Sequence, residues 1–91
     1  MAVAVLVEIR GGTQEQYEQV AARIFPDGKL PAGWLLHVSG AAEGDWRVVN
    51  VVESQEEFER FARETILPAT REAGEEPPQF TFFPVHTLMR A

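Results

Sequence analysis

Residues 33–61 read GWLLHVSGAAEGDWRVVNVVESQEEFERF, and this stretch carries the pattern that decides the fold. Residues 33–39 and 45–53 are rich in β-branched and aromatic side chains, which are typical of β-strands. The intervening run, Gly40-Ala-Ala-Glu-Gly44, has the glycines that a hairpin turn needs. Ser54-Gln-Glu-Glu57 then matches a capping box, the arrangement that satisfies free amides at a helix start. The stretch therefore predicts two antiparallel strands followed directly by a helix.

Alternation along the two strands predicts which side chains share a face. On the first strand, Trp34, Leu36 and Val38 point to one side. By the same rule, His37 points to the opposite side. On the second strand, one face carries an amide among apolar residues, in the order Trp46, Val48, Asn50 and Val52. A buried amide is costly without a hydrogen-bond partner, so we expect this one to meet a protein group or a ligand.

The segment before this stretch predicts one strand and one helix. Residues 2–10 alternate as a strand that ends at Gly11-Gly12. Thr13-Gln-Glu-Gln16 follows as another capping box, and an apolar stripe continues from it at helical spacing. Pro26-Asp27-Gly28 ends this helix, because proline lacks the amide that the helical ladder requires.

The segment after it predicts the rest of a second helix and a fourth strand. Pro68 lies inside the helical pattern and predicts a kink or a short final segment, and Gly74 predicts the end of the helix. Residues 79–89 have the composition of a strand. Because Pro84 cannot donate to a sheet ladder, this strand is expected at an edge of the sheet or with a bulge.

The order of elements predicts a single α+β domain over residues 1–91, of the ferredoxin-like βαββαβ type. In that fold both helices cover one face of a four-stranded antiparallel sheet. The strands here are apolar on both faces, and monomers rarely expose so large an apolar patch. We therefore predict a homodimer closed by sheet-to-sheet packing, which makes a dimeric α/β barrel. The alternative is a monomer whose loops cover the second face.

The composition argues against several classes of partner. The formal net charge is −6, with 14 acidic and 8 basic residues, and Lys29 is the only lysine. We therefore expect neither nucleic acid nor an anionic membrane surface as a partner. The absence of cysteine excludes disulfides and thiolate metal sites. The apolar run at residues 1–7 stops at Glu8 and is too short for a signal core, so we expect a cytoplasmic protein.

A few polar and aromatic residues are candidates for a site. His37 and Asn50 are the catalytic candidates, because an imidazole serves as a general base near neutral pH and an amide orients a ligand. The candidates for ligand contact are Tyr17, Trp34, Trp46 and His86. Each of these residues also fits a structural role in the core or at the dimer contact. The spacing of the histidines and acidic residues matches no known metal-binding pattern, so we expect no metal.

Residues 33–61 also resemble a group of small, mostly uncharacterised bacterial proteins of the dimeric α/β-barrel superfamily. The similarity lies in the strand that carries His37, in the hairpin partner at residues 44–49 and in the Glu53-Ser54 start of the second helix. Antibiotic-biosynthesis monooxygenases and haem-degrading monooxygenases belong to this superfamily. The resemblance implies a small monooxygenase-like enzyme that acts on an aromatic or quinol-type molecule and uses no cofactor.

Two departures from the relatives bear on this expectation. Haem-degrading members use an asparagine on the first strand, and residues 2–10 contain none, which argues against haem degradation. Members often have Asp and Trp where this chain has Asn50 and Val52. The alternatives to an enzyme are a non-catalytic ligand-binding or accessory barrel, such as a stress-response module, and an assembly unit without a ligand. The residues alone leave open whether the chain catalyses a reaction.

Overall fold

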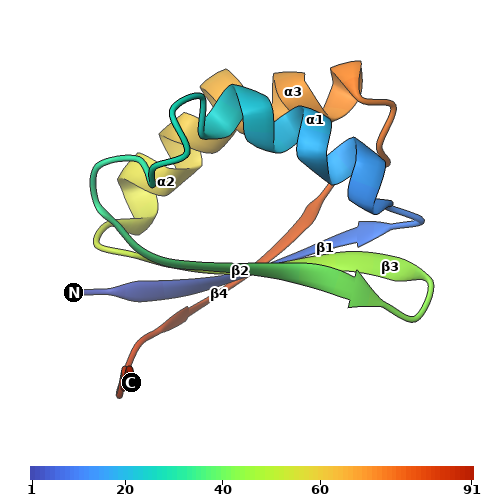
Figure 1. Cartoon of the computed structure of the whole chain (residues 1–91). Helices are drawn as coiled ribbons and strands as arrows, with labels where there is room; N and C mark the ends of the chain where they lie inside the picture. Colours follow the sequence, from blue (N-terminus) through green and yellow to red (C-terminus); the bar gives the residue numbers. More distant parts are fainter.

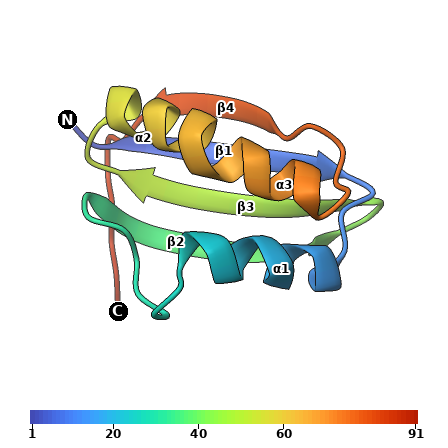
Figure 2. The same ribbon diagram turned by 90° about the horizontal axis from the view of Figure 1, so that it is seen from above.

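The computed structural model describes residues 1–91 and has the predicted βαββαβ order (Figure 1). One antiparallel sheet contains the four strands in the order β2-β3-β1-β4. All the helices lie on one face of this sheet, as the view from above shows (Figure 2). The elements are β1 (Val3–Arg10), α1 (Gln14–Ile24), β2 (Trp34–Ala42), β3 (Asp45–Val52), α2 (Gln55–Phe61), the π-helical turn η1 (Ala62–Ile66), α3 (Leu67–Glu72) and β4 (Gln79–Pro84).

The start of α1 has the predicted capping box. The Gln16 amide donates to Thr13 Oγ1 at 3.1 Å, and the Thr13 amide donates to Gln16 Oε1 at 3.2 Å. Gly12, just before the cap, has a separate role: a β-carbon there would lie 2.8 Å from the β-carbon of Trp46. Glycine at this position therefore lets the β1–α1 connection lie directly against the sheet.

The second predicted helix is one continuous helical segment, made of α2, η1 and α3, with a wider turn in the middle. Ser54 caps its start by accepting a bond from the Glu57 amide at 3.2 Å, which is one half of the predicted capping box. The Leu67 amide bonds to the Ala62 carbonyl, five residues back, so the turn before Pro68 is π-helical. Proline has no amide and its ring crowds the carbonyl four residues earlier, and a wider turn relieves this conflict. The predicted kink or final segment thus takes the form of η1 followed by α3.

A β-bulge at the start of β2 changes which face its side chains occupy. Trp34 pairs with Val52 and Leu36 pairs with Val51, so Leu35 is an extra residue on the β2 side. The bulge shifts the alternation by one position. Trp34 and His37 consequently both face the helices, and the prediction that they lie on opposite faces is wrong.

The structure also corrects two predicted boundaries. The β2–β3 hairpin turns at Glu43-Gly44 alone, because β2 continues to Ala42, whereas the sequence predicted a turn over residues 40–44. The fourth strand ends at Pro84 instead of residue 89. As predicted, β4 is an edge strand. Residues 85–91 leave the sheet after one bond from the Val85 amide to the Ala2 carbonyl (Figure 1).

The core fills the space between the sheet and the helices. Phe58 of α2 is 2% exposed and belongs to one buried cluster with the inward-facing side chains of β1 and β3, among them Val5, Val7, Ile9, Val48 and Val52. None of the helices is both long enough and apolar enough to cross a membrane.

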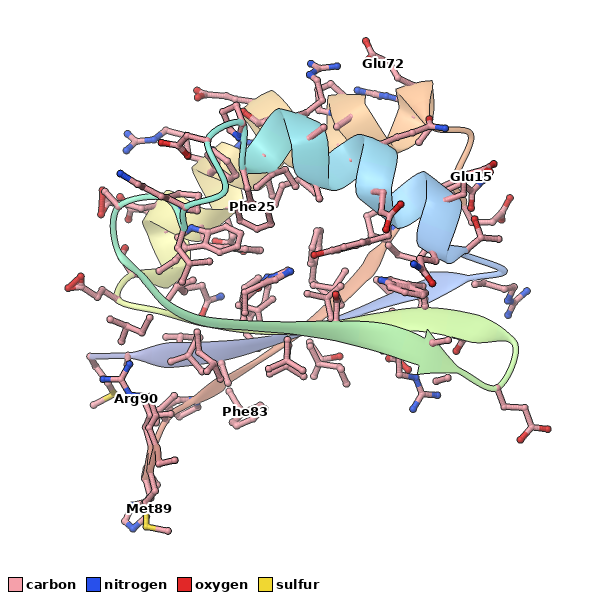
Figure 3. The ribbon with its side chains drawn as sticks, viewed as in Figure 1. Glu15, Phe25, Glu72, Phe83, Met89 and Arg90 are labelled. Carbon is pink, nitrogen blue, oxygen red and sulfur yellow. The ribbon has the colours of Figure 1, made fainter.

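The opposite side of the sheet, called the outer face below, carries no helix (Figure 3). Two cross-strand rows form it, one of Val38, Val49, Leu6 and Thr81 and the other of Leu36, Val51, Ala4 and Phe83. Val38 and Phe83 are each 54% exposed. The outer face is therefore mostly apolar and partly open, as the sequence predicts.

Candidate functional site

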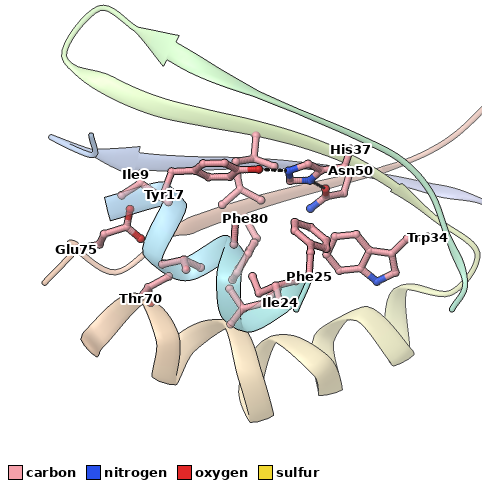
Figure 4. A pocket seen from close by; sticks show the side chains of 15 residues that line it. Ile9, Tyr17, Ile24, Phe25, Trp34, His37, Asn50, Thr70, Glu75 and Phe80 are labelled. Carbon is pink, nitrogen blue, oxygen red and sulfur yellow. Dashed lines mark hydrogen bonds between the residues drawn. The ribbon is translucent and has the colours of Figure 1, made fainter. Parts of the chain in front are cut away.

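A small cavity lies between the sheet and the helices and is the candidate site (Figure 4). Its volume is about 40 Å³, and 11 of its 15 lining residues are hydrophobic. The other four are His37, Asn50, Thr70 and Glu75, and Tyr17, which is counted among the hydrophobic residues, adds a polar hydroxyl. Apolar walls with a few polar groups are typical of a site that binds and orients a small molecule.

Three of these polar side chains form a hydrogen-bonded chain. The Tyr17 hydroxyl lies 2.7 Å from His37 Nε2, and His37 Nδ1 lies 2.7 Å from Asn50 Oδ1. His37 and Asn50 are direct cross-strand partners on β2 and β3, and α1 brings Tyr17 over them (Figure 4). The bulge at Leu35 is what turns His37 toward Asn50.

The chemistry of these three side chains determines which atom donates and which accepts in each hydrogen bond. Asn50 Oδ1 is only an acceptor, so His37 Nδ1 carries the proton between them. In the neutral imidazole, Nε2 then has a free lone pair that accepts the Tyr17 O–H. Asn50 is 3% exposed and therefore holds the imidazole from the interior of the protein. The arrangement presents a basic nitrogen behind a tyrosine hydroxyl.

Aromatic rings hold the chain in place on both sides. Trp46 stacks on Tyr17 with ring centroids 5.3 Å apart, and Phe25 meets the His37 ring edge-on at 4.9 Å. Trp34 packs against Phe25 at 5.8 Å and lines the cavity. Such contacts stabilise particular ring orientations, so the imidazole and the phenol are preorganised.

A second hollow lies on the other side of the Tyr17 and His37 wall. It is a more open groove of about 440 Å³, bordered by α1 and by the loop that follows it. The groove and the cavity share Tyr17, Ala21, Phe25 and His37. Phe25 stands just outside the regular helix as its C-cap. The hydrogen-bonded chain is therefore in contact with both spaces.

Glu75 is the unusual member of the cavity wall. Both of its carboxylate oxygens are buried and neither has a hydrogen-bond partner. Its backbone is fixed by the end of α3, where the Glu75 amide bonds to the Thr70 carbonyl and the Gly74 amide bonds to the Arg71 carbonyl. These two bonds form a Schellman motif, with Gly74 at φ +78°. Burial raises the pKa of the Glu75 carboxyl above its ordinary value of 4.5.

Replacing Glu75 by glutamine is expected to remove part of the pH dependence of stability. Because the folded-state pKa of Glu75 is raised, the folded chain holds this proton more tightly than the unfolded chain. The stabilisation is complete below pH 4.5 and is lost as the pH rises through the folded-state pKa. At about pH 8 the Glu75→Gln variant should unfold at a higher temperature than the wild type, because glutamine has no charge to bury, with little difference near pH 4.

Thermal unfolding followed by circular dichroism at both pH values measures this difference. Glu76→Gln is the matched control, because Glu76 is the exposed neighbour of Glu75 and should show no such change. An equal shift for Glu75→Gln at both pH values would contradict the prediction.

The structure brings together four of the six residues selected from the sequence: Tyr17, Trp34, His37 and Asn50 all line the cavity. Trp46 is buried behind Tyr17 and does not line it. His86 is exposed in the segment after β4 and lies outside the cavity. No three side chains among histidine, aspartate and glutamate are arranged to hold a metal ion.

The sequence candidates did not include Phe25 or Glu75, although both line the cavity. One signal for Glu75 was present, since it directly follows the helix-ending Gly74. The residue at that position often makes an apolar contact with the preceding turn, and a glutamate there is unusual.

Comparison with known proteins identifies the fold. Neither a protein-family model nor a curated protein matches the chain. SnoaB, a cofactor-independent oxygenase from Streptomyces nogalater solved as a point variant, matches 99% of this chain and 98% of its own, at 16% identity and a TM-score of 0.68. A Deinococcus radiodurans protein described as an antibiotic biosynthesis monooxygenase matches 100% and 98%, at 11% identity and a TM-score of 0.62. This chain has the fold of the antibiotic-biosynthesis monooxygenases.

A third solved structure extends the likeness to a ligand complex. The ActVA-Orf6 monooxygenase of Streptomyces coelicolor, solved with nanaomycin D, matches 99% of this chain and 92% of its own. Its sequence identity is 20% and its TM-score is 0.57. At identities this low the likeness concerns the fold, and activity has to be argued from the site itself.

Proposed function

We propose that this protein is a cofactor-independent monooxygenase-like enzyme that acts on an aromatic or quinol-type small molecule. The observation that carries the proposal is the Tyr17–His37–Asn50 chain, which places a base behind a tyrosine hydroxyl in a mostly apolar cavity. The solved structures of the same fold, which include a cofactor-independent oxygenase and a monooxygenase, add support. The same pattern suits proton removal from an acidic phenol or a carbon activated by an aromatic ring.

The donor–acceptor direction of these hydrogen bonds defines the path by which a proton leaves the substrate. The substrate proton moves to Tyr17 Oη as the tyrosine proton moves to His37 Nε2. His37 Nδ1–H donates a hydrogen bond to Asn50 Oδ1 throughout, so Asn50 holds the ring and stabilises the imidazolium that forms. Tyr17 and His37 are thus the proton-transfer pair, and Asn50 is a positioning residue.

The resulting substrate anion is electron-rich and reacts with dioxygen directly. In an anthrone-type substrate, a CH₂ group and O₂ give a carbonyl and one water. One oxygen atom enters the carbon centre, and the other leaves as water with the two hydrogens of that carbon. The carbon supplies all four electrons, so the reaction consumes no external reductant.

A substrate of this size needs more room than the cavity holds at rest. Drug-sized ligands occupy pockets of about 300–1,000 Å³. The cavity of about 40 Å³ is separated from the groove of about 440 Å³ by side chains that include Phe25. Displacement of Phe25 would join the two spaces beside His37. We therefore place substrate entry on the side of α1 and of the loop after it.

The outer face of the sheet supports a homodimer as the functional form. Its two apolar rows cross all the strands, and their most exposed members are 54% open to solvent. A second copy of the chain, packed sheet to sheet, would cover them and close the α/β barrel. The helices and the cavity lie on the other side of the sheet, so each protomer would keep a complete site (Figure 3).

Oxygen consumption tests the enzymatic proposal. The purified protein is mixed with anthrone, naphthoquinol and phenol substrates, and oxygen uptake is recorded alongside the product spectrum. We expect uptake of one O₂ for each anthrone converted to the quinone, well above the rate of autoxidation. Binding of these compounds without turnover would replace this proposal by the non-catalytic ligand-binding barrel.

A further inference from the structure

Glu75 has no role in the proton transfer described above, yet it lies in the same cavity. Its two carboxylate oxygens and Trp46 Nε1 are the only buried side-chain polar atoms without a hydrogen bond. A buried polar atom without a partner costs free energy, and most native proteins avoid it. Glu75 therefore requires either a neutral form, a ligand or both.

The surroundings of Glu75 favour the neutral form. No lysine or arginine lines the cavity, and the other titratable residues that line it are Tyr17 and His37. Glu75 takes part in no salt bridge. A neutral carboxylic acid is a hydrogen-bond donor, and neither oxygen of the Glu75 carboxyl has a protein hydrogen-bond partner.

The backbone of Glu75 is held in place by the end of α3. The Schellman motif at the end of α3 fixes its backbone, and β4 begins four residues later. In Figure 4, Glu75 lies near Ile9 at one end of the pocket, and Tyr17 lies between Glu75 and the His37–Asn50 pair. The Glu75 carboxyl and the His37–Asn50 pair thus lie apart along the cavity, on either side of Tyr17.

We propose that Glu75 is the second polar contact for the ligand: its neutral carboxyl donates a hydrogen bond to a carbonyl oxygen at the end of the ligand farthest from His37. The inference rests on the proposed function and names a substrate class for the same site. The ligands selected are planar aromatic molecules with a hydroxyl at one end and a carbonyl at the opposite end. A ligand with a hydroxyl alone would leave the Glu75 donor unpaired and bind more weakly.

Calorimetric titration with two matched probes tests this selection on the full chain. The probes are 2-naphthol and 6-acetyl-2-naphthol, which differ by an acetyl group that places a carbonyl at the far end of the ring system. The wild type is expected to bind the ketone about 10-fold more tightly, as one additional hydrogen bond provides. Glu75→Leu should lose this preference. Glu75→Gln keeps a neutral donor and should retain the preference to within about 3-fold.

The outcomes separate this inference from the proposed function. Glu76→Leu, on the exposed neighbour, should leave both affinities unchanged. If Glu75→Leu still prefers the ketone, or if the wild type binds 2-naphthol without preferring the ketone, the inference alone is overturned. If the wild type binds neither probe and consumes no oxygen with any substrate, the inference fails together with the proposed function.

Discussion

Replacing His37 by alanine is expected to lower the turnover of an oxidised aromatic substrate by about 100- to 10,000-fold, the usual contribution of a general base. Without the imidazole, the Tyr17 hydroxyl loses its acceptor at 2.7 Å and the proton from the substrate has no buried destination. Binding should change far less than turnover, because the aromatic walls that contact the ligand remain. The measurement is kcat from oxygen uptake, together with the affinity for 2-naphthol from calorimetry.

His86→Ala is the matched control for this variant, since it removes the other histidine from an exposed position outside the cavity. It should retain the wild-type rate. Tyr17→Phe keeps the ring that stacks on Trp46 and removes only the hydroxyl, so we expect an intermediate loss of about 10-fold or more. Equal rates for the His37 and His86 variants would remove His37 from the mechanism.

Introducing carboxylates on the outer face is expected to convert a dimer into monomers. In a Val38→Glu, Val49→Glu double variant, each protomer carries two charges in one cross-strand row of that face. Sheet-to-sheet packing would bury these charges without partners, which costs several kcal/mol. A loss of about 4 kcal/mol weakens association about 1,000-fold. Light scattering should therefore give the monomer mass of 10.2 kDa for the variant and twice that mass for the wild type.

Leu30→Glu is the control for a charge at an exposed apolar residue away from the sheet. This variant should keep the mass of the dimer. A wild-type mass near 10.2 kDa at micromolar concentration would overturn the dimer proposal. In that case the outer face would be open in solution, and its apolar rows would need another explanation.

Local sequence signals accounted for most of the fold. The cap at Thr13, the cap at Ser54 and the stop at Gly74 lie where the sequence predicts them. Each depends on bonds between residues a few positions apart, so a short stretch of sequence contains the whole signal. The last strand was predicted too long, because the composition of residues 79–89 outweighed the missing donor of Pro84.

The site was predictable in its residue types and not in its geometry. His37 and Asn50 stood out as polar residues in apolar strands, and they prove to be bonded partners. Their pairing could not be derived, since strict alternation placed His37 on the face opposite to Trp34. A single inserted residue at Leu35 reverses that assignment, and the bulge appears only when β2 is paired with β3.

The sequence by itself determined the order of elements and the apolar character of both sheet faces, because alternation, caps and turn residues act over short distances. Only the tertiary structure decided that Tyr17 reaches His37 from another element, and that Phe25 separates the cavity from the groove. It also decided that the Glu75 carboxylate oxygens are buried without a hydrogen-bond partner. These features depend on register and on packing between distant segments, which pair side chains that no local pattern connects.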